Sequence, residues 1–137
     1  MENPFHRQAA AITFRDTDAS GWMHFTNIFH HVEVAEHACL RKLGLLVFDR
    51  TQGGWPRVHV DCDYRRPLLC GDEIEIHLAI AALGASSVTW KFEVLKATGD
   101  LSATGTLVTV RVDHQGKPQP LSGEERDCLT PAVRPDY

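Results

Sequence analysis

A short stretch near the start of the chain, FRDTDASGWMHFTN at residues 14–27, gathers residue types that can carry out chemistry. Two acids, Asp16 and Asp18, stand one residue apart, and Gly21 follows the second. A carboxylate can attack a carbonyl carbon, or it can act as a general base toward water. His24 is a further candidate for a role beside Asp18. An isolated D-x-D-x-x-G pattern is more often an Asx-turn or a helix cap, so spacing alone does not establish a catalytic site.

The residues after this loop predict a helix from about Asn27 to Leu43. Its apolar residues recur at steps of three and four and fall on one narrow stripe: Ile28, Val32, Ala35, Cys39 and Leu43. Asn27 is a favourable N-cap residue, and Gly44 stands where a C′ glycine is expected. The start of a helix presents unpaired N–H groups and the positive end of the helix dipole. The loop therefore leads to a place where a developing negative charge can be stabilised.

The rest of the chain predicts an antiparallel sheet and one short helix. Alternation of apolar and polar residues indicates strands at 10–15, 57–65, 73–80, 88–94 and 102–113. Turns at 83–85 and 98–100 favour a meander, and the tail predicts a helix over 124–129 before prolines that mark the end of ordered structure. A sheet and an amphipathic helix bury their apolar faces by packing together. We therefore expect an α+β fold in which about five antiparallel strands wrap around one long central helix.

Length and composition narrow the classes of function. A chain of 137 residues, 43% hydrophobic and 23% charged, is typical of one globular domain, which we expect to span 1–137. The net charge of −4 gives no basic surplus for phosphate backbones, so no nucleic-acid partner is expected. Without an apolar signal segment or a membrane span, the sequence predicts no membrane partner and a cytoplasmic location. The four cysteines form no C-x-x-C pair, which argues against a disulfide framework or a zinc site.

The order of elements and the string FRDTDASGWMHFTNIFHHVEVAE resemble the hotdog-fold acyl-CoA thioesterases of the 4-hydroxybenzoyl-CoA thioesterase type. The likeness continues through YRRPLLCGDEIEI and SSVTWKFEVL to about Asp113. The resemblance implies that Asp18 is the catalytic carboxylate and that the backbone amide around Phe25 polarises the thioester carbonyl. It also matches Glu33 to a helical Glu of the family, fifteen residues after the second acid. Some relatives carry a His seven residues after the acid, where this chain has Phe25 and places His24 one position earlier.

Further residues are candidates for substrate binding: Gly21, Trp22, Phe29, Glu33, Trp55, Arg65 and Arg66. The aromatic side chains suit an acyl pocket, although a chain of this composition also needs aromatics to fill its core. The arginines can bind the phosphates of coenzyme A or can simply form a solvated strand face. His30, Glu33 and His37 share a helix flank, but no H-E-x-x-H motif is present and the family needs no metal, so no metal site is expected.

The predicted function is hydrolysis of an acyl-CoA thioester to the free acid and coenzyme A. Asp18 serves as nucleophile or as general base, and no cofactor is expected besides the coenzyme A thioester, which is the substrate. The alternative is a noncatalytic module that binds an acyl ligand on the same fold, with Asp18 capping the helix. A hydratase is a weaker third hypothesis, because the Asp and His arrangement that such enzymes use is not found in the sequence.

The segment RVHVDCDYR at 57–65 is the candidate edge strand of the sheet, because its outer face is polar and its length suits a two-fold antiparallel pair. Hotdog proteins of this type join two sheets edge to edge and bind ligand between subunits. The resemblance therefore implies a homodimer or homotetramer. In that arrangement Asp18 of one copy faces a pocket that the other copy completes, and Glu33 lies near the junction.

Overall fold

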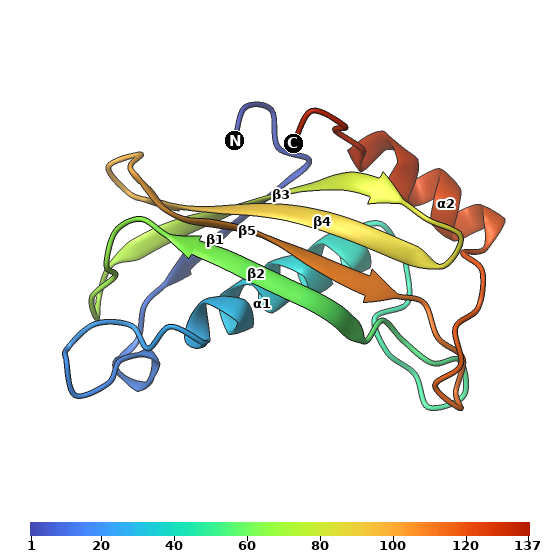
Figure 1. The fold of residues 1–137 in the computed structure, drawn as a ribbon, viewed down its shortest axis with the longest axis horizontal. Coiled ribbons are helices and arrows are strands. Elements are labelled where there is room, and N and C mark those ends of the chain that lie inside the picture. Colours follow the sequence, from blue (N-terminus) through green and yellow to red (C-terminus); the bar gives the residue numbers. More distant parts are fainter.

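Five antiparallel strands form one curved sheet in the computed structural model, which describes residues 1–137 (Figure 1). In their order across the sheet, the strands are β1 (His6–Ala11), β3 (Glu73–Leu83), β4 (Ser87–Lys96), β5 (Leu101–Val110) and β2 (Arg57–Tyr64). Helix α1 (Asn27–Lys42) lies across one face of this sheet, and the shorter α2 (Gly123–Leu129) lies at one end of it. The antiparallel sheet of five strands confirms that part of the prediction.

The apolar stripe of α1 packs against the inward side chains of the sheet. Ile28, Val32 and Ala35 are fully buried, and they join one core cluster with the central strand residues Ile76, Leu78, Ile80, Trp90, Phe92 and Val94. Burial of a large apolar side chain contributes about 1.5–3 kcal/mol relative to leaving it exposed. The pairing of this stripe with the sheet therefore fixes the position of α1 and of its first turn.

The expectation of one long central helix is not confirmed, because the chain has two helical segments. Helix α1 has 16 residues, while α2 has 7 and continues into the 3-10 turn Thr130–Ala132. Beyond this turn, the N–H of Arg134 donates to the carbonyl of Ile80, so the tail is held against β3 as far as Arg134, which directly precedes the last proline, Pro135. Neither helix has the length and apolar character needed to cross a membrane.

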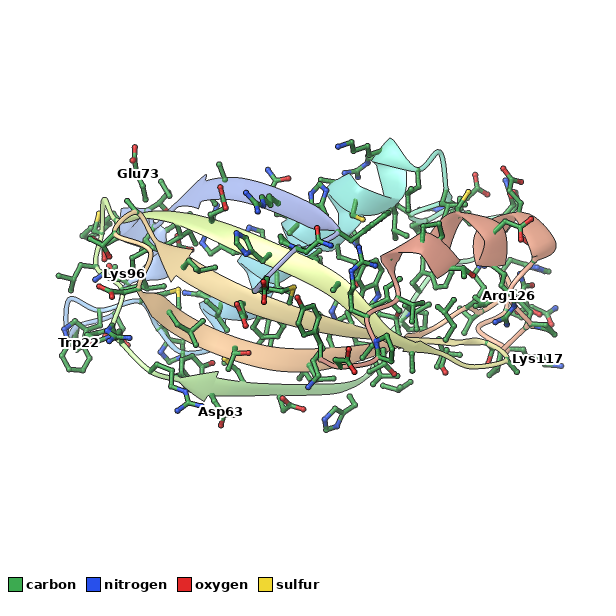
Figure 2. All side chains as sticks on the ribbon, turned by 90° about the horizontal axis from the view of Figure 1, so that it is seen from above. Trp22, Asp63, Glu73, Lys96, Lys117 and Arg126 are labelled. Atoms are coloured by element: carbon green, nitrogen blue, oxygen red, sulfur yellow. The ribbon has the colours of Figure 1, made fainter.

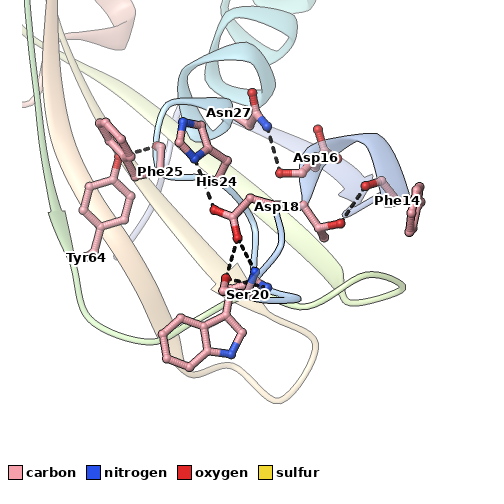
Figure 3. Close-up of polar contacts among 10 residues, drawn as sticks. Phe14, Asp16, Asp18, Ser20, His24, Phe25, Asn27 and Tyr64 are labelled. Carbon is pink, nitrogen blue, oxygen red and sulfur yellow. Dashed lines mark hydrogen bonds and ion pairs between the residues drawn. The ribbon is translucent and has the colours of Figure 1, made fainter.

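Two predicted features near the first strand were wrong in their placement. Strand β1 ends at Ala11, and Phe14–Asp16 forms a 3-10 turn, η1, because the carboxylate of Asp16 turns back to accept the N–H of Thr13. Asn27 is the first residue of α1 and does not act as its N-cap. Its side chain donates instead to the carbonyl of Asp16, so it ties the helix to the preceding turn (Figure 3).

Strand β2 lies at the sheet edge, as its sequence predicted, but it does not have a single solvated face. Val58 is 63% exposed and Val60 is 41% exposed, and polar residues on the other side of the strand are exposed as well. No other element of the chain covers β2 on its outer side, because only β5 pairs with it. The edge therefore presents both unpaired backbone groups and apolar side chains.

Gly105 of β5 is a position where the sheet admits no side chain, and it yields a stability prediction. A Cβ at Gly105 would overlap the carbonyl of Asp61 and lie 2.6 Å from Cζ of Phe92. Gly105→Ala should therefore lower the free energy of unfolding by about 1–3 kcal/mol through overpacking. Gly123→Ala, where a Cβ meets nothing within 4 Å, is the control and should leave stability unchanged or slightly higher. Urea unfolding compares the two variants, and equal stabilities would contradict the packing described.

Candidate active site

Asp18 lies in the loop between η1 and α1, where its carboxylate has a fixed orientation and remains open to solvent (Figure 3). Oδ1 accepts the N–H of Ser20 at 2.8 Å and its hydroxyl at 2.5 Å, while Oδ2 lies 3.2 Å from Nδ1 of His24. Gly21, with φ of +83°, completes the turn with an N–H bond to the carbonyl of Asp18. The side chain of Asp18 is 41% exposed, so a reactant can reach it.

The surroundings of Asp18 keep its carboxyl group ionised. Hydrogen bonds from the hydroxyl and the N–H of Ser20, with a smaller contribution from His24, lower its pKa below the usual 3.8. Asp16, two residues earlier, is buried and differs in role. Burial raises the pKa of Asp16, but hydrogen bonds from Thr13 and His31 outweigh this and lower it. Asp16 therefore holds the loop in place.

The start of α1 supplies free backbone donors directly after His24, the residue that contacts Asp18. The N–H of His24 donates to the carbonyl of Asp16, but the N–H groups of Phe25 and Thr26 donate to no protein acceptor. The carbonyl of Phe25 accepts the hydroxyl of Tyr64 at 2.5 Å, which joins the start of the helix to the end of β2. Unpaired N–H groups at a helix start can stabilise an oxyanion. The loop thus presents a carboxylate and oxyanion donors within a few residues of each other.

An apolar hollow of about 290 Å³ lies beside this loop. Among the predicted site residues, the structure brings Trp22, Phe25, Arg65 and Arg66 to its lining, together with Ile28 and Tyr64. Trp22 is 54% exposed and Phe25 is 60% exposed, so both rings are accessible from solvent. The guanidinium of Arg66 donates to the carbonyl of Leu101. The hollow can hold an apolar group while two cations stand at its border.

Glu33 and Trp55, two further candidates for substrate binding, do not line this hollow. Both line a separate hollow of about 560 Å³ beside the start of β2, where Glu33 is 3.5 Å from the guanidinium of Arg57. Trp22 and Lys117, whose neighbour Gly116 lines this second hollow, mark opposite ends of the molecule in Figure 2. The two hollows are far apart because they lie at opposite ends of β2, and eight residues in an extended strand span roughly 26 Å.

Three more residues near the site remain to be placed: Phe29, which was a binding candidate, and Tyr64 and Glu36, which the sequence analysis did not single out. Phe29 points into the core and packs edge-on against Phe92, with 6.5 Å between ring centroids. Tyr64 had no signal beyond its place in an alternating strand. Glu36 is 1% exposed, with Arg57 at 3.2 Å, and burial raises the pKa of Glu36 to about 7 against the opposing effect of Arg57. The pattern of apolar residues in the helix did not predict that Glu36 would be buried.

Comparison with known proteins gives consistent results. The sequence profile of the thioesterase-like superfamily matches residues 12–133. The 1,4-dihydroxy-2-naphthoyl-CoA hydrolase of Synechococcus elongatus is 39% identical over 77 residues, which cover 53% of this chain and 57%, or little more than half, of that relative. The protein of the same name from Trichodesmium erythraeum is 32% identical over 124 residues, covering 86% of this chain and 90% of its own. A Thermus thermophilus thioesterase complexed with coenzyme A and Zn superposes with a TM-score of 0.84 at 26% identity, covering 96% and 97% of the two chains.

The hydrogen bonds to Asp18 yield a prediction for its titration. Ser20→Ala removes the hydroxyl donor and keeps the backbone N–H, so the ionised form of Asp18 loses part of its stabilisation and its pKa should rise toward 3.8. Carbon-13 NMR titration of the carboxyl group measures this. Thr51→Ala is the matched control, because Thr51 makes the same two contacts to Asp49 and should shift only the pKa of Asp49. An Asp18 pKa that is equal in the wild-type protein and Ser20→Ala would refute the assignment.

Proposed function

The chain belongs to the thioesterase-like superfamily, and we propose that it hydrolyses an acyl-coenzyme A thioester to the free acid and coenzyme A on a hotdog fold. The observation that carries the proposal is that an open, ionised carboxylate, Asp18, contacts His24, and that the next two residues, Phe25 and Thr26, have unpaired N–H groups. Relatives named as CoA hydrolases, and a structural neighbour complexed with coenzyme A, support coenzyme A as the thiol component.

Two routes of hydrolysis fit this geometry. In the first, an oxygen of Asp18 attacks the thioester carbon, the carbonyl oxygen becomes an oxyanion near the N–H groups of Phe25 and Thr26, and the carbon–sulfur bond breaks to release the thiolate. Water then hydrolyses the mixed anhydride. In the second, Asp18 removes a proton from a water molecule that attacks instead. The lowered pKa of Asp18 keeps the carboxylate ionised, as both routes require.

His24 has a supporting part in either route. Its Nδ1 lies 3.2 Å from Oδ2 of Asp18, and its ring packs against that of Phe25 with 4.9 Å between centroids. It therefore orients the carboxylate and borders the helix start. The leaving thiolate of coenzyme A is stable enough that a strong general acid is less necessary than in amide cleavage. His24 is for this reason assigned to positioning, and Asp18 to the chemical step.

The hollow beside the loop suits an apolar, preferably aromatic, acyl group. Trp22 and Phe25 expose their rings there, and the volume of about 290 Å³ matches a small ring system better than a long chain. The names of the relatives, which specify a dihydroxynaphthoyl group, support an aryl substrate. We propose that Arg65 and Arg66, which line the hollow, bind the phosphates of coenzyme A, because guanidinium groups bind phosphate oxygens in bidentate fashion.

The noncatalytic alternative required Asp18 to cap α1. No side chain caps this helix, and every contact of the Asp18 carboxylate is made to Ser20 or His24 of the loop. A helix cap is therefore not what holds Asp18 in place. The Asx-turn that Asp18 does form uses Oδ1 and leaves Oδ2 with His24 alone, which suits a reactive oxygen better than a purely structural one.

A second copy of the chain is proposed to complete the site. The exposed edge of β2 can pair with the same strand of another copy about a two-fold axis, which covers Val58 and Val60. Antiparallel pairing would set the Tyr64 end of one β2 beside the Arg57 end of the other. The two hollows, which stand at opposite ends of one chain, would then meet across the junction, with Asp18 from one copy and Glu33 from the other.

Replacement of Asp18 tests the function directly. Asp18→Asn keeps the shape of the side chain but removes its nucleophilic and basic character, so hydrolysis of aryl-CoA thioesters should fall roughly 10²–10⁴-fold. Release of free thiol from a panel of acyl-CoAs measures this, and affinity for a nonhydrolysable thioether analogue should be retained. His24→Ala should lose less activity than Asp18→Asn. Asp127→Asn, at an exposed carboxylate of α2 that lines neither hollow, is the control and should keep wild-type turnover. Near-wild-type turnover by folded Asp18→Asn would remove Asp18 from the mechanism.

A further inference from the structure

His31 and Asp16 form a buried pair just behind the loop that carries Asp18. His31 is 9% exposed and Asp16 is 7% exposed, and Nε2 of His31 lies 3.0 Å from Oδ2 of Asp16. Because hydrogen bonds keep the pKa of Asp16 low, its carboxyl group is an acceptor only, and Nε2 of His31 is the donor. The same Oδ2 also accepts the N–H of Thr13 at 2.8 Å and its hydroxyl at 3.0 Å. The second turn of α1 is thus joined to the 3-10 turn before the loop.

The backbone of Asp16 extends this connection to the reacting groups. Its carbonyl accepts the N–H of His24 at 2.8 Å and the side-chain amide of Asn27 at 2.8 Å (Figure 3). His24 in turn contacts the carboxylate of Asp18. The peptide bond that follows His24 carries the free N–H of Phe25. A displacement of Asp16 would therefore move both the orienting contact to Asp18 and the donors at the start of α1. A residue that fixes Asp16 controls the geometry of the site without touching a substrate.

We propose that His31 is a positioning residue for hydrolysis, acting through Asp16 on His24 and on the free N–H groups at the start of α1. This inference rests on the proposed thioesterase function. His31 lies outside the hollow beside Asp18, and it faces a polar hollow of about 440 Å³ lined by Thr13, Arg15, Asp16, Asn27, His30 and His31. Its effect is accordingly on the rate of the chemical step. Affinity for the acyl-CoA should change little, because none of the residues that line the apolar hollow is altered.

Substitutions at position 31 separate positioning from packing. His31→Leu fills the space of the ring but removes the hydrogen-bond donor to Asp16. His31→Gln keeps a donor to Asp16, because the amide nitrogen of Gln can take the place of Nε2. His31→Asn is a polar variant whose shorter side chain does not reach. His30→Leu is the matched control, because His30 is exposed, lines the same polar hollow and makes no hydrogen bond. Circular dichroism and thermal unfolding establish that each variant is folded.

The expected result is a loss in kcat with little change in KM. Misplacing catalytic groups by about 1 Å can cost about 10²-fold, so His31→Leu and His31→Asn should lower kcat by about 10-fold to 100-fold. KM should stay within about twofold, and His31→Gln should retain most of the wild-type kcat. Hydrogen exchange gives a readout that does not depend on activity. The amide of His24 should exchange faster in His31→Leu and at the wild-type rate in His30→Leu.

Distinct outcomes would overturn the inference. A wild-type kcat in folded His31→Leu or His31→Asn would show that His31 does not act on the site. A loss in His31→Gln as large as in His31→Leu would show that the donor to Asp16 is not what matters. A rise in KM without a fall in kcat would assign His31 to binding. A wild-type protein that hydrolyses no acyl-CoA would instead refute the proposed function itself, and the exchange rate of His24 would still show whether the coupling exists.

Discussion

The arrangement of this protein depends on the burial of one helical stripe against one sheet. Ile28, Val32 and Ala35 of α1 are inaccessible to solvent because the inner face of the sheet closes over them. Since a helix is rigid over 16 residues, burial of its middle also fixes its first turn, and with it the free N–H groups of Phe25 and Thr26. The loop before α1 then has to hold Asp18 near the start of this helix. It does so through the hydrogen bonds of Asp16, whose side chain and carbonyl join the two ends of the loop.

Much of the fold could be predicted because the periods of its apolar residues are strong. The limits of α1 and the positions of β3 and β4 follow from those periods and from the turn glycines. The first strand was displaced because alternation in a short segment fits two placements, and hydrogen bonding by the Asp16 side chain decided between them. The different roles of Asp16 and Asp18 are a matter of burial, which spacing alone does not reveal. The separation of Glu33 from Asp18 follows from the path of the chain through α1 and β2 and could not be read from sequence distance.

The exposed edge of β2 connects the fold to the function. Within one chain, the carboxylate and the apolar hollow lie at one end of this strand, and the charged hollow of Glu33 and Arg57 lies at the other. A two-fold antiparallel pair would remove the exposed apolar surface of Val58 and Val60 and would bring unlike ends together. The exposed apolar edge, which is unfavourable in an isolated chain, would thus favour the pairing that completes the site. Under the proposed pairing, the dimer would be the functional unit, and each site would draw residues from both copies.

Mixing two inactive variants is the measurement that tests this account most directly. One variant is Asp18→Asn, and the other is Glu33→Lys, which reverses the charge of the second hollow at a half-exposed position. If sites are shared, a mixed dimer carries one site with both defects and one intact site, so random exchange should restore about a quarter of wild-type thioester hydrolysis. Native mass spectrometry establishes that mixed dimers form. Activity in the mixture that does not exceed the average of the two variants, with mixed dimers present, would contradict a site built from two copies.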